Sequence, residues 1–234
     1  MKKVLKLLGG FIGLLFLTAI VFGIVIHEPL PEGDKGPKAD ELAKKMLTAL
    51  HYEAYQNTRF LEWSFQGGNN TYVWDKAMGQ CAVKWGDFEI KLNLSYPKKS
   101  IALRNNDLLA GRDRQKAIAK ALSNFNNDSF WLVAPYKVFD KGTTRRIVSL
   151  EDGSSGLLVT YNTGGTTPGD SYLWSLDSNS FPNSYKMWVR LIPIGGLEAS
   201  WDDWFISESG AFLPKSHQLG PFELDMGNVR GYND

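Results

Sequence analysis

Acidic and imidazole side chains gather near the C-terminal end of the chain, where they could support acid–base chemistry. Asp202 and Asp203 stand between two tryptophans, and Glu208 and His217 follow. Paired carboxylates hydrolyse glycosidic bonds when both reach the same bond. On a regular β-strand, however, adjacent residues such as Asp202 and Asp203 point to opposite faces. We therefore expect a solvated hairpin end here, and a glycan or lipid hydrolase is the weakest of three functional alternatives.

The other nucleophiles and bases form no recognisable catalytic set. His51 follows the apolar face of a helical segment, and the only cysteine, Cys81, is in phase with Val83 and Trp85. The sequence has no Gly-x-Ser-x-Gly motif and no phosphate-binding loop. One cysteine and three dispersed histidines do not supply the usual four ligands of a structural zinc site. The sequence thus predicts no catalytic residue, no metal and no cofactor.

Aromatic side chains are the main candidates for binding. The chain has eight Trp, nine Tyr and thirteen Phe, and most of the tryptophans lie in segments of alternating polarity. Aromatic residues favour half-buried strands, but they also line apolar pockets. They could therefore fill the core, or some of them could line a cavity for an acyl chain or another amphipathic ligand. The candidate ligand-binding residues are Trp63, Phe65, Trp74, Trp85, Trp131, Trp174 and Trp188.

The first half of the chain must position the first four of these residues. Residues 38–55 carry apolar side chains at helical spacing just after Pro37, which predicts a helix. From residue 58 the period changes to two, and turn residues divide residues 58–94 into four short antiparallel strands. This pattern predicts a β-meander with Trp63, Phe65, Trp74 and Trp85 on its strands.

A second helical segment lies in the middle of the chain. Residues 108–125 return to helical spacing, and the polar triplet Asn126-Asn127-Asp128 is predicted to end the helix. Residues 130–140 are mostly apolar but contain Pro135. Proline is excluded from central strands, so this stretch is predicted to be a short segment packed on the core.

The remaining residues return to β-structure. Turn signals separate six candidate strands, at residues 144–150, 156–161, 171–176, 185–192, 197–206 and 222–229. Within one of them, Trp188 shares its face with Lys186 and Arg190. This placement predicts an exposed ring, at the mouth of a cavity or against a lipid headgroup.

The N-terminal end predicts a membrane anchor. An apolar run of twenty residues begins at Leu7 and ends at Ile26, after a basic start that contains three lysines. Such a run is long enough to span a bilayer, and the positive-inside rule places residues 1–6 in the cytoplasm. We expect a single-pass signal anchor in the inner membrane at residues 7–26, a linker at residues 27–37 and a periplasmic domain at residues 38–234.

Two alternatives to the anchor remain. A cleaved signal peptide would leave a soluble periplasmic protein, although the run is longer than most signal peptides and no Ala-x-Ala site follows it. The run could also be a buried helix of a soluble protein. Lipoprotein processing is excluded, because the only cysteine is Cys81, far downstream of the apolar run.

Composition narrows the function of the exported part. The net charge is +1, and lysines and arginines are dispersed, so nothing favours nucleic-acid binding. A single cysteine allows no disulfide within the chain. About 200 residues follow the anchor, which is enough for one domain with a sizeable core.

The order of elements resembles a known family. A helix, a four-stranded meander, a second helix and about six strands are arranged as in the periplasmic lipoprotein carriers of the LolA/LolB-like superfamily. Three motifs resemble uncharacterised exported bacterial members of that superfamily: Trp74-Asp75-Lys76, Phe130-Trp131-Leu132-Val133-Ala134-Pro135-Tyr136-Lys137 and Gly169-Asp170-x-Tyr172-x-Trp174. The resemblance implies a mainly β (α+β) fold over residues 38–230, an antiparallel half-open barrel of about ten strands with two plugging helices.

The resemblance does not imply one activity, because its members share the fold and not an established function. A retained anchor also departs from the soluble carriers, which shuttle between membranes. The favoured hypothesis is a non-enzymatic envelope protein that binds a lipid-like ligand in the half-barrel. The second alternative is a protein-interaction or scaffold domain whose core is filled by its own side chains, and the third is the hydrolase.

Overall fold

The structure is a computed structural model that describes residue 23 and residues 25–234. Most of the apolar run at residues 7–26 lies outside the described residues, and the expected membrane anchor with it. In the described part of the chain, no helix is both long and apolar enough to cross a membrane. Residues 25–234 form a mainly β, α+β fold, which confirms the predicted fold class.

One antiparallel sheet, here named sheet I, contains the predicted meander. Its strand order is β15-β1-β2-β3-β4-β5-β6, so the C-terminal strand β15 returns to pair with β1. The alternation of buried and exposed residues along β1 to β3 confirms the period of two. The strands are β1 Phe60–Phe65, β2 Asn70–Asp75, β3 Gln80–Trp85, β4 Phe88–Asn93, β5 Ile101–Arg104, β6 Asp107–Leu108 and β15 Arg230–Tyr232.

The second antiparallel sheet, sheet II, contains most of the C-terminal half. Its order is β12-β13-β11-β10-β9-β8-β7, and β14 also pairs with β13. Within the described residues neither sheet closes into a barrel. The strands are β7 Thr143–Ser149, β8 Ser155–Tyr161, β9 Ser171–Leu176, β10 Pro182–Trp188, β11 Leu197–Ser200, β12 Asp203–Ile206, β13 Phe212–Leu219 and β14 Phe222–Asp225.

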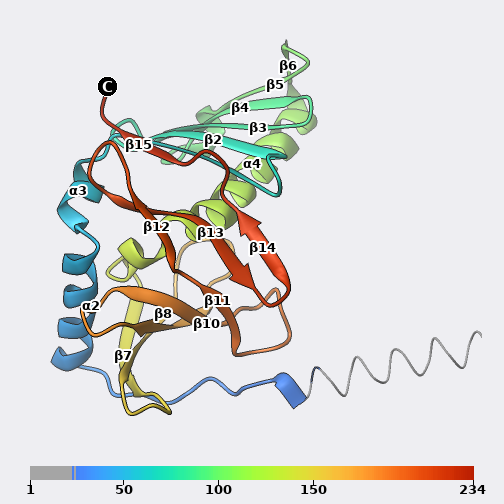
Figure 1. The fold of residues 1–234 in the computed structure, drawn as a ribbon. Helices are drawn as coiled ribbons and strands as arrows, with labels where there is room; N and C mark the ends of the chain where they lie inside the picture. Colours follow the sequence, from blue (N-terminus) through green and yellow to red (C-terminus); the bar gives the residue numbers. More distant parts are fainter. Residues whose placement is uncertain (1–22, 24) are drawn as a thin grey trace, which may run out of the picture.

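The helices pack against both sheets. Helix α4 contacts β4 and β5 of sheet I and β13 of sheet II, whereas α2 contacts β7 and β8. Figure 1 shows α4 beneath sheet I and α2 along one side of the molecule. The helices are α2 Pro37–Ala49, α3 Tyr52–Asn57 and α4 Gly111–Val133, with short 3₁₀ turns at η1 Pro97–Lys99 and η2 Ala134–Lys137.

The helix expected at residues 38–55 is broken into α2 and α3. His51 adopts a left-handed conformation with φ of 53° between the two helices. The Tyr136 hydroxyl donates to the Leu50 carbonyl (3.0 Å), which a continuous helix would use internally. The break also lets Tyr55 stack on Tyr136, with ring centroids 4.0 Å apart. Tertiary contacts thus override helical periodicity here.

Helix α4 is longer than the sequence predicts. The triplet at residues 126–128 does not end it, and the helix continues to Val133. Asp128 is buried inside the fold, where its carboxylate accepts hydrogen bonds from Asn70 and Tyr72 of β2. Asp128 therefore continues the helix, because its hydrogen-bond partners come from a distant strand. The following residues form the 3₁₀ turn η2 and no strand, and they pack on the core through Tyr136, as predicted.

The second half contains more strands than predicted, and the described residues have fifteen strands in all instead of about ten. The expected strand at residues 197–206 is interrupted at Trp201 and Asp202, which separate β11 from β12. The strand expected at residues 185–192 ends at Trp188, and that at residues 222–229 ends at Asp225. The sequence does not predict β13, because this strand contains Pro214 and proline disfavours strands. Pro214 is opposite Trp204 of β12, whereas β14 pairs only with residues 216–219 of β13.

Most of the linker expected at residues 27–37 packs against the domain, and we call residues 27–35 the strap. The strap crosses the lower edge of the molecule in Figure 1. Asp34 forms an isolated β-bridge with Ile147 of β7, and the backbone amide of Glu28 donates to the Gly195 carbonyl (3.0 Å). The strap thus joins the N-terminal end of the described chain to sheet II at two points.

Candidate ligand-binding pocket

A pocket of about 570 Å³ lies between the C-terminal half of α4 and the loop that joins β8 to β9. We call it the α4 pocket. Its volume is within the range of small-molecule sites. Helix α4 provides one side, including Ser123, Asn126, Asp128, Phe130 and Val133, and residues 163–167 of the loop provide the opposite side.

Three aromatic rings form the deep wall of the pocket. Phe130 of α4 lies 5.3 Å from the Tyr161 ring and 4.6 Å from the Tyr172 ring, between centroids. Burial raises the pKa of both tyrosines well above their ordinary value. Both phenols are therefore un-ionised at neutral pH. Among the described residues, the Tyr172 hydroxyl has no hydrogen-bond partner, so it is available to a ligand.

A buried carboxylate supports the helical side of the pocket. Asp128 is 1% exposed. One oxygen accepts from the Asn70 amide (2.9 Å) and from the Tyr72 hydroxyl, and the other accepts from the Asn127 amide (2.9 Å). Burial, followed by the hydrogen bond to Asp128, raises the pKa of Tyr72 well above its ordinary value. Asp128 therefore acts as a structural acceptor that ties α4 to sheet I.

A second carboxylate holds the loop side. Asp170 is buried and accepts from the Thr167 hydroxyl and from the Arg190 backbone amide (2.9 Å). Across the opening, the Asn126 amide donates to the Thr166 hydroxyl (3.3 Å). These bonds fix the loop relative to α4 and to the residues that follow β10.

The rim of the pocket combines charge with one exposed leucine. Lys137 forms an ion pair with Asp140, and Lys141 stands beside them. Within residues 25–234, Lys141 has no ion-pair partner. Leu191 completes the rim and is 72% exposed. An aromatic wall below an apolar rim that also carries Lys141 suits a ligand that has an apolar part and a polar head.

Of the seven predicted ligand-binding residues, only Trp74 lines this pocket. Its ring packs edge-on against Phe125, with centroids 5.1 Å apart. Trp63, Phe65 and Trp174 are buried in the closed core between the sheets and helices. The remaining three are half-buried and pack on neighbouring groups: Trp85 on Phe88, Trp131 on Tyr185 and His217, and Trp188 on the strap.

Trp188 differs from the exposed ring that the sequence predicts. Its indole nitrogen donates to the Glu28 carbonyl of the strap (2.8 Å). The adjacent Lys186 ammonium pairs with the Glu28 carboxylate at 2.7 Å. The strap therefore binds to the strand face shared by Trp188 and Lys186, and we call this binding surface, with the adjacent Gly195 and Gly196, the seat.

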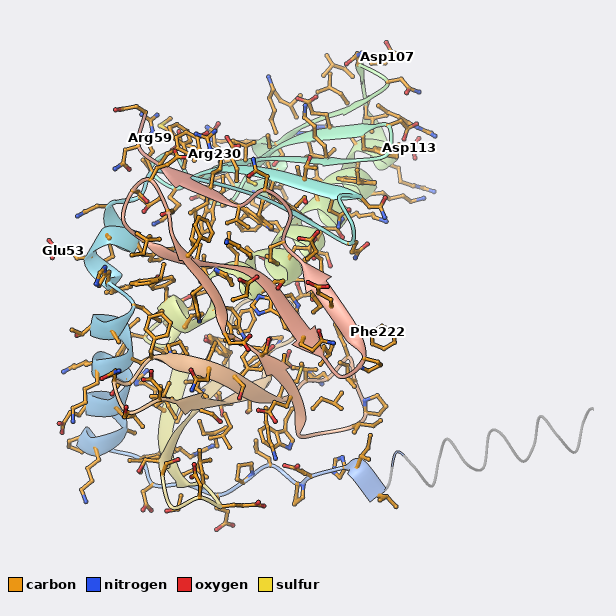
Figure 2. All side chains as sticks on the ribbon, viewed as in Figure 1. Glu53, Arg59, Asp107, Asp113, Phe222 and Arg230 are labelled. Atoms are coloured by element: carbon orange, nitrogen blue, oxygen red, sulfur yellow. The ribbon has the colours of Figure 1, made fainter. Side chains whose placement is uncertain are left out.

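The acid–base candidates do not assemble into a catalytic site. The Glu208 carboxylate is paired with Arg230, which is labelled in Figure 2. His217 is buried, and its two ring nitrogens contact the carbonyls of Ser200 (2.8 Å) and Trp131 (2.7 Å). Burial lowers the pKa of His217, against the opposite effect of the two carbonyls. Neither ring nitrogen is free to act on a substrate.

Asp202 and Asp203 are both exposed and precede a register shift at the start of β12. Asp202 lies between β11 and β12 and belongs to neither strand, so the regular alternation behind their expected opposite orientations does not hold here. Asp203 accepts from the Ser216 hydroxyl (2.9 Å) across the strand pair. Within the described residues, no group of three or more His, Cys, Asp or Glu side chains could hold a metal ion.

Another large hollow, about 980 Å³, lies outside α2 and α3. Its residues are mostly exposed and polar, such as Lys44, Thr48 and Glu53, and Figure 2 shows Glu53 projecting away from the fold. Its aromatic residues are His51, Tyr52 and Phe139, of which His51 and Phe139 are exposed, whereas Tyr172 of the α4 pocket is buried. The α4 pocket is therefore the better candidate for a binding site.

Most residues of the α4 pocket cannot be predicted from the sequence. Tyr161 and Tyr172 lie on β8 and β9, where the sequence predicts strands, and Tyr172 belongs to the motif Gly169-Asp170-x-Tyr172-x-Trp174. Nothing local in the sequence shows that these residues face Phe130 across a cavity. The available signal was the motif itself, which combines a loop-fixing Asp170 with the inward-facing Tyr172.

No protein-family model matches this chain, and no curated protein is similar to it. The α4 pocket must therefore be interpreted from its own residues.

Cys81 provides a direct test of the core. Its thiol is buried, and burial raises its pKa, so it lacks both access and thiolate character. We expect native protein to resist a maleimide reagent and to react only when unfolded in urea, as measured by the mass of the adduct. Rapid labelling of the native protein would contradict this packing of β3. The positive control is a Leu191→Cys variant, because the side chain at position 191 is exposed and its thiol should react in the native protein.

Proposed function

We propose that this chain is a membrane-anchored, non-enzymatic envelope protein that binds an amphipathic, lipid-like ligand in the α4 pocket. The observation that carries the proposal is the pocket itself, with Phe130, Tyr161 and Tyr172 as an aromatic wall below a rim that contains Lys141. Burial of an acyl chain would supply affinity at about 0.8 kcal/mol per methylene. The Tyr172 hydroxyl and Lys141 would recognise the polar head.

The arrangement of α4 supports a half-barrel in which a helix plugs an apolar interior. Helix α4 contacts strands of both sheets, and the α4 pocket opens along its C-terminal half. Such an arrangement is what a LolA/LolB-like carrier would need. The proposed ligand site lies between α4 and the β8–β9 loop, which shifts it away from most of the tryptophans singled out in the sequence.

The proposed location is the inner membrane, with residues 7–26 as a single-pass anchor and the domain in the periplasm. The apolar length of that run and the lysines that precede it support this placement. Cleavage of the run is the alternative, and it would release a soluble periplasmic binding protein.

A protein-interaction domain is the second candidate function. Its support is the packed core: Trp174, Trp201 and Tyr185 contact one another edge-on or at a tilt where an open half-barrel would be hollow. Phe222 on β14 is 67% exposed and projects from the side of the molecule in Figure 2. A partner could therefore bind at β14 without using the α4 pocket.

Photo-crosslinking in native membranes distinguishes the two candidates. A benzophenone amino acid is placed at Ser123, which is exposed and lines the α4 pocket, in the full-length chain. We expect adducts with the mass of a lipid after irradiation. The matched control carries the same group at Lys120, one turn earlier on α4 and outside the pocket, and should give few lipid adducts. Protein adducts alone at Ser123, or no adduct, would contradict ligand binding there.

Narrowing the pocket should reduce the same signal. In a Thr166→Trp variant, the indole would occupy the opening between the loop and α4. Excluding only two methylenes from the pocket costs about 1.6 kcal/mol, so we expect roughly a tenfold loss of lipid adduct at Ser123. A Thr71→Trp variant, exposed on sheet I, should leave the yield unchanged.

A further inference from the structure

The strap is seated on sheet II by contacts at its membrane-proximal end. The backbone amide of Glu28 donates to Gly195, and its carbonyl accepts from the Trp188 indole (2.8 Å). The carboxylate of Glu28 pairs with Lys186, and the His27 ring accepts from the Gly195 amide (3.0 Å). Four neighbouring groups thus hold two consecutive residues of the strap.

Glycines in the seat show that it is built for close approach. A Cβ atom on Gly196 would lie 2.6 Å from the Glu28 Cβ, and one on Gly195 would lie 2.7 Å from the Glu28 carbonyl oxygen. Gly33, at the other end of the strap, would meet the Ile147 carbonyl oxygen at 2.7 Å. Larger residues at these positions would lift the strap off the sheet.

The bound strap leaves no slack between the apolar run and the domain. The run ends at Ile26, and the next residue, His27, is already bound to Gly195. Gly23 lies next to the Ile194 side chain: a Cβ atom added to Gly23 would be 3.7 Å from the Ile194 Cδ1. The N-terminal end of the described chain therefore lies beside the loop at residues 189–196, at the lower right of Figure 1.

This loop presents apolar and basic side chains next to the apolar run. Its sequence from Arg190 to Ile194 is Arg-Leu-Ile-Pro-Ile, and Arg190, Leu191 and Pro193 are exposed. An exposed leucine beside an arginine matches a bilayer surface, where apolar side chains enter the interface and cations contact anionic headgroups. Leu191 also belongs to the rim of the α4 pocket.

We propose that the loop at residues 190–194 docks on the headgroup region of the same bilayer that holds residues 7–26, with the rim of the α4 pocket against the membrane. The partner is the phospholipid surface, because a chain without slack places the loop there. This inference rests on the proposed membrane anchor and lipid-like ligand. Its consequence is that a lipid could pass between bilayer and pocket beside Leu191 without crossing water.

The docking is tested on the full-length chain in vesicles of phosphatidylethanolamine and phosphatidylglycerol. A Leu191→Cys variant is labelled with an environment-sensitive fluorophore under native conditions, where Cys81 is buried. We expect the emission to shift to shorter wavelength, and brominated lipids to quench about half of it, since interfacial groups lie roughly 5–10 Å deep. The matched control is Met78→Cys, which replaces another exposed apolar residue (61% exposed) distant from the strap.

Exchanging the charges of Glu28 and Lys186 tests whether the strap positions the loop at residues 190–194 against the bilayer. Glu28→Lys or Lys186→Glu alone places like charges at a contact of 2.7 Å, so each should lower the quenching at position 191 at least twofold. The double exchange restores an attractive pair and should recover the quenching. Unchanged quenching in both single variants would show that the strap does not position the loop.

Outcomes for docking and for ligand binding can be separated. Equal or absent quenching at positions 191 and 78 would overturn the docking, while lipid adducts at Ser123 would still support the pocket. Quenching at position 191 without lipid adducts would support docking and overturn the ligand. Release of the chain from membranes by alkaline carbonate would overturn the anchor and the docking together.

Discussion

Replacing Asp128 with alanine should lower the free energy of unfolding by about 3–5 kcal/mol, because two buried donors lose their acceptor. The Asn70 amide donates to this carboxylate at 2.9 Å, and the Tyr72 hydroxyl donates to the same oxygen. All three groups are buried, so water does not replace the lost bonds. The variant also separates α4 from β2, and we therefore expect it to weaken the helical side of the α4 pocket.

Urea titration of the full-length chain measures this effect, with the labelling of Cys81 as the signal for unfolding. Tyr72→Phe removes one donor and leaves the carboxylate in place, so it should cost only about 1 kcal/mol. Combining the two substitutions should cost less than the sum, since the Tyr72 donor is then no longer stranded. A loss below about 1 kcal/mol for Asp128→Ala would show that these bonds do not join α4 to sheet I.

Replacing Trp174 with alanine should lower the free energy of unfolding by about 3–5 kcal/mol, as large-to-small substitutions of buried tryptophans do. Trp174 is 0% exposed. Its ring packs edge-on against Tyr185 and Trp201, with centroid distances of 5.0 and 5.1 Å. The cavity left by the indole would be enclosed on several sides, which limits relaxation.

A phenylalanine at the same position separates packing from hydrogen bonding. Within the described residues, the Trp174 indole nitrogen has no hydrogen-bond partner, so Trp174→Phe forfeits part of the packing and no bond. We expect a loss of about 1–2 kcal/mol, measured by the same Cys81 titration. If Trp174→Ala were as mild as Trp174→Phe, a closely packed core at this position would be contradicted.

The comparison between these two residues shows what local patterns can predict. Trp174 was expected on an alternating strand, and β9 has the bounds that the pattern indicated. The burial of Asp128 could not be predicted, because a polar triplet in sequence is typical of a helix end and its partners Asn70 and Tyr72 lie more than fifty residues away. Long-range hydrogen bonds reversed the local preference.

Residues of the candidate site likewise differ in whether a local pattern predicts them. Trp74 was expected to line a cavity, and it does, whereas Trp63 and Trp174 alternate equally well but face other side chains. Alternation assigns a residue to the inner face of a strand and contains no information about what lies opposite. Phe130 lies on α4, in a segment expected to lie outside any helix. Its contact with Tyr161 and Tyr172 could therefore not be predicted from the sequence.

By itself, the sequence determined the mainly β class, the meander of residues 60–93, helix α2 and the apolar run at residues 7–26, because each depends on periodicity or length over neighbouring residues. Only the tertiary structure decided where a void remains, that α4 runs through Asp128, and that the strap binds sheet II beside Leu191. These features depend on contacts between residues distant in the chain, where burial and hydrogen-bond satisfaction outweigh local propensity.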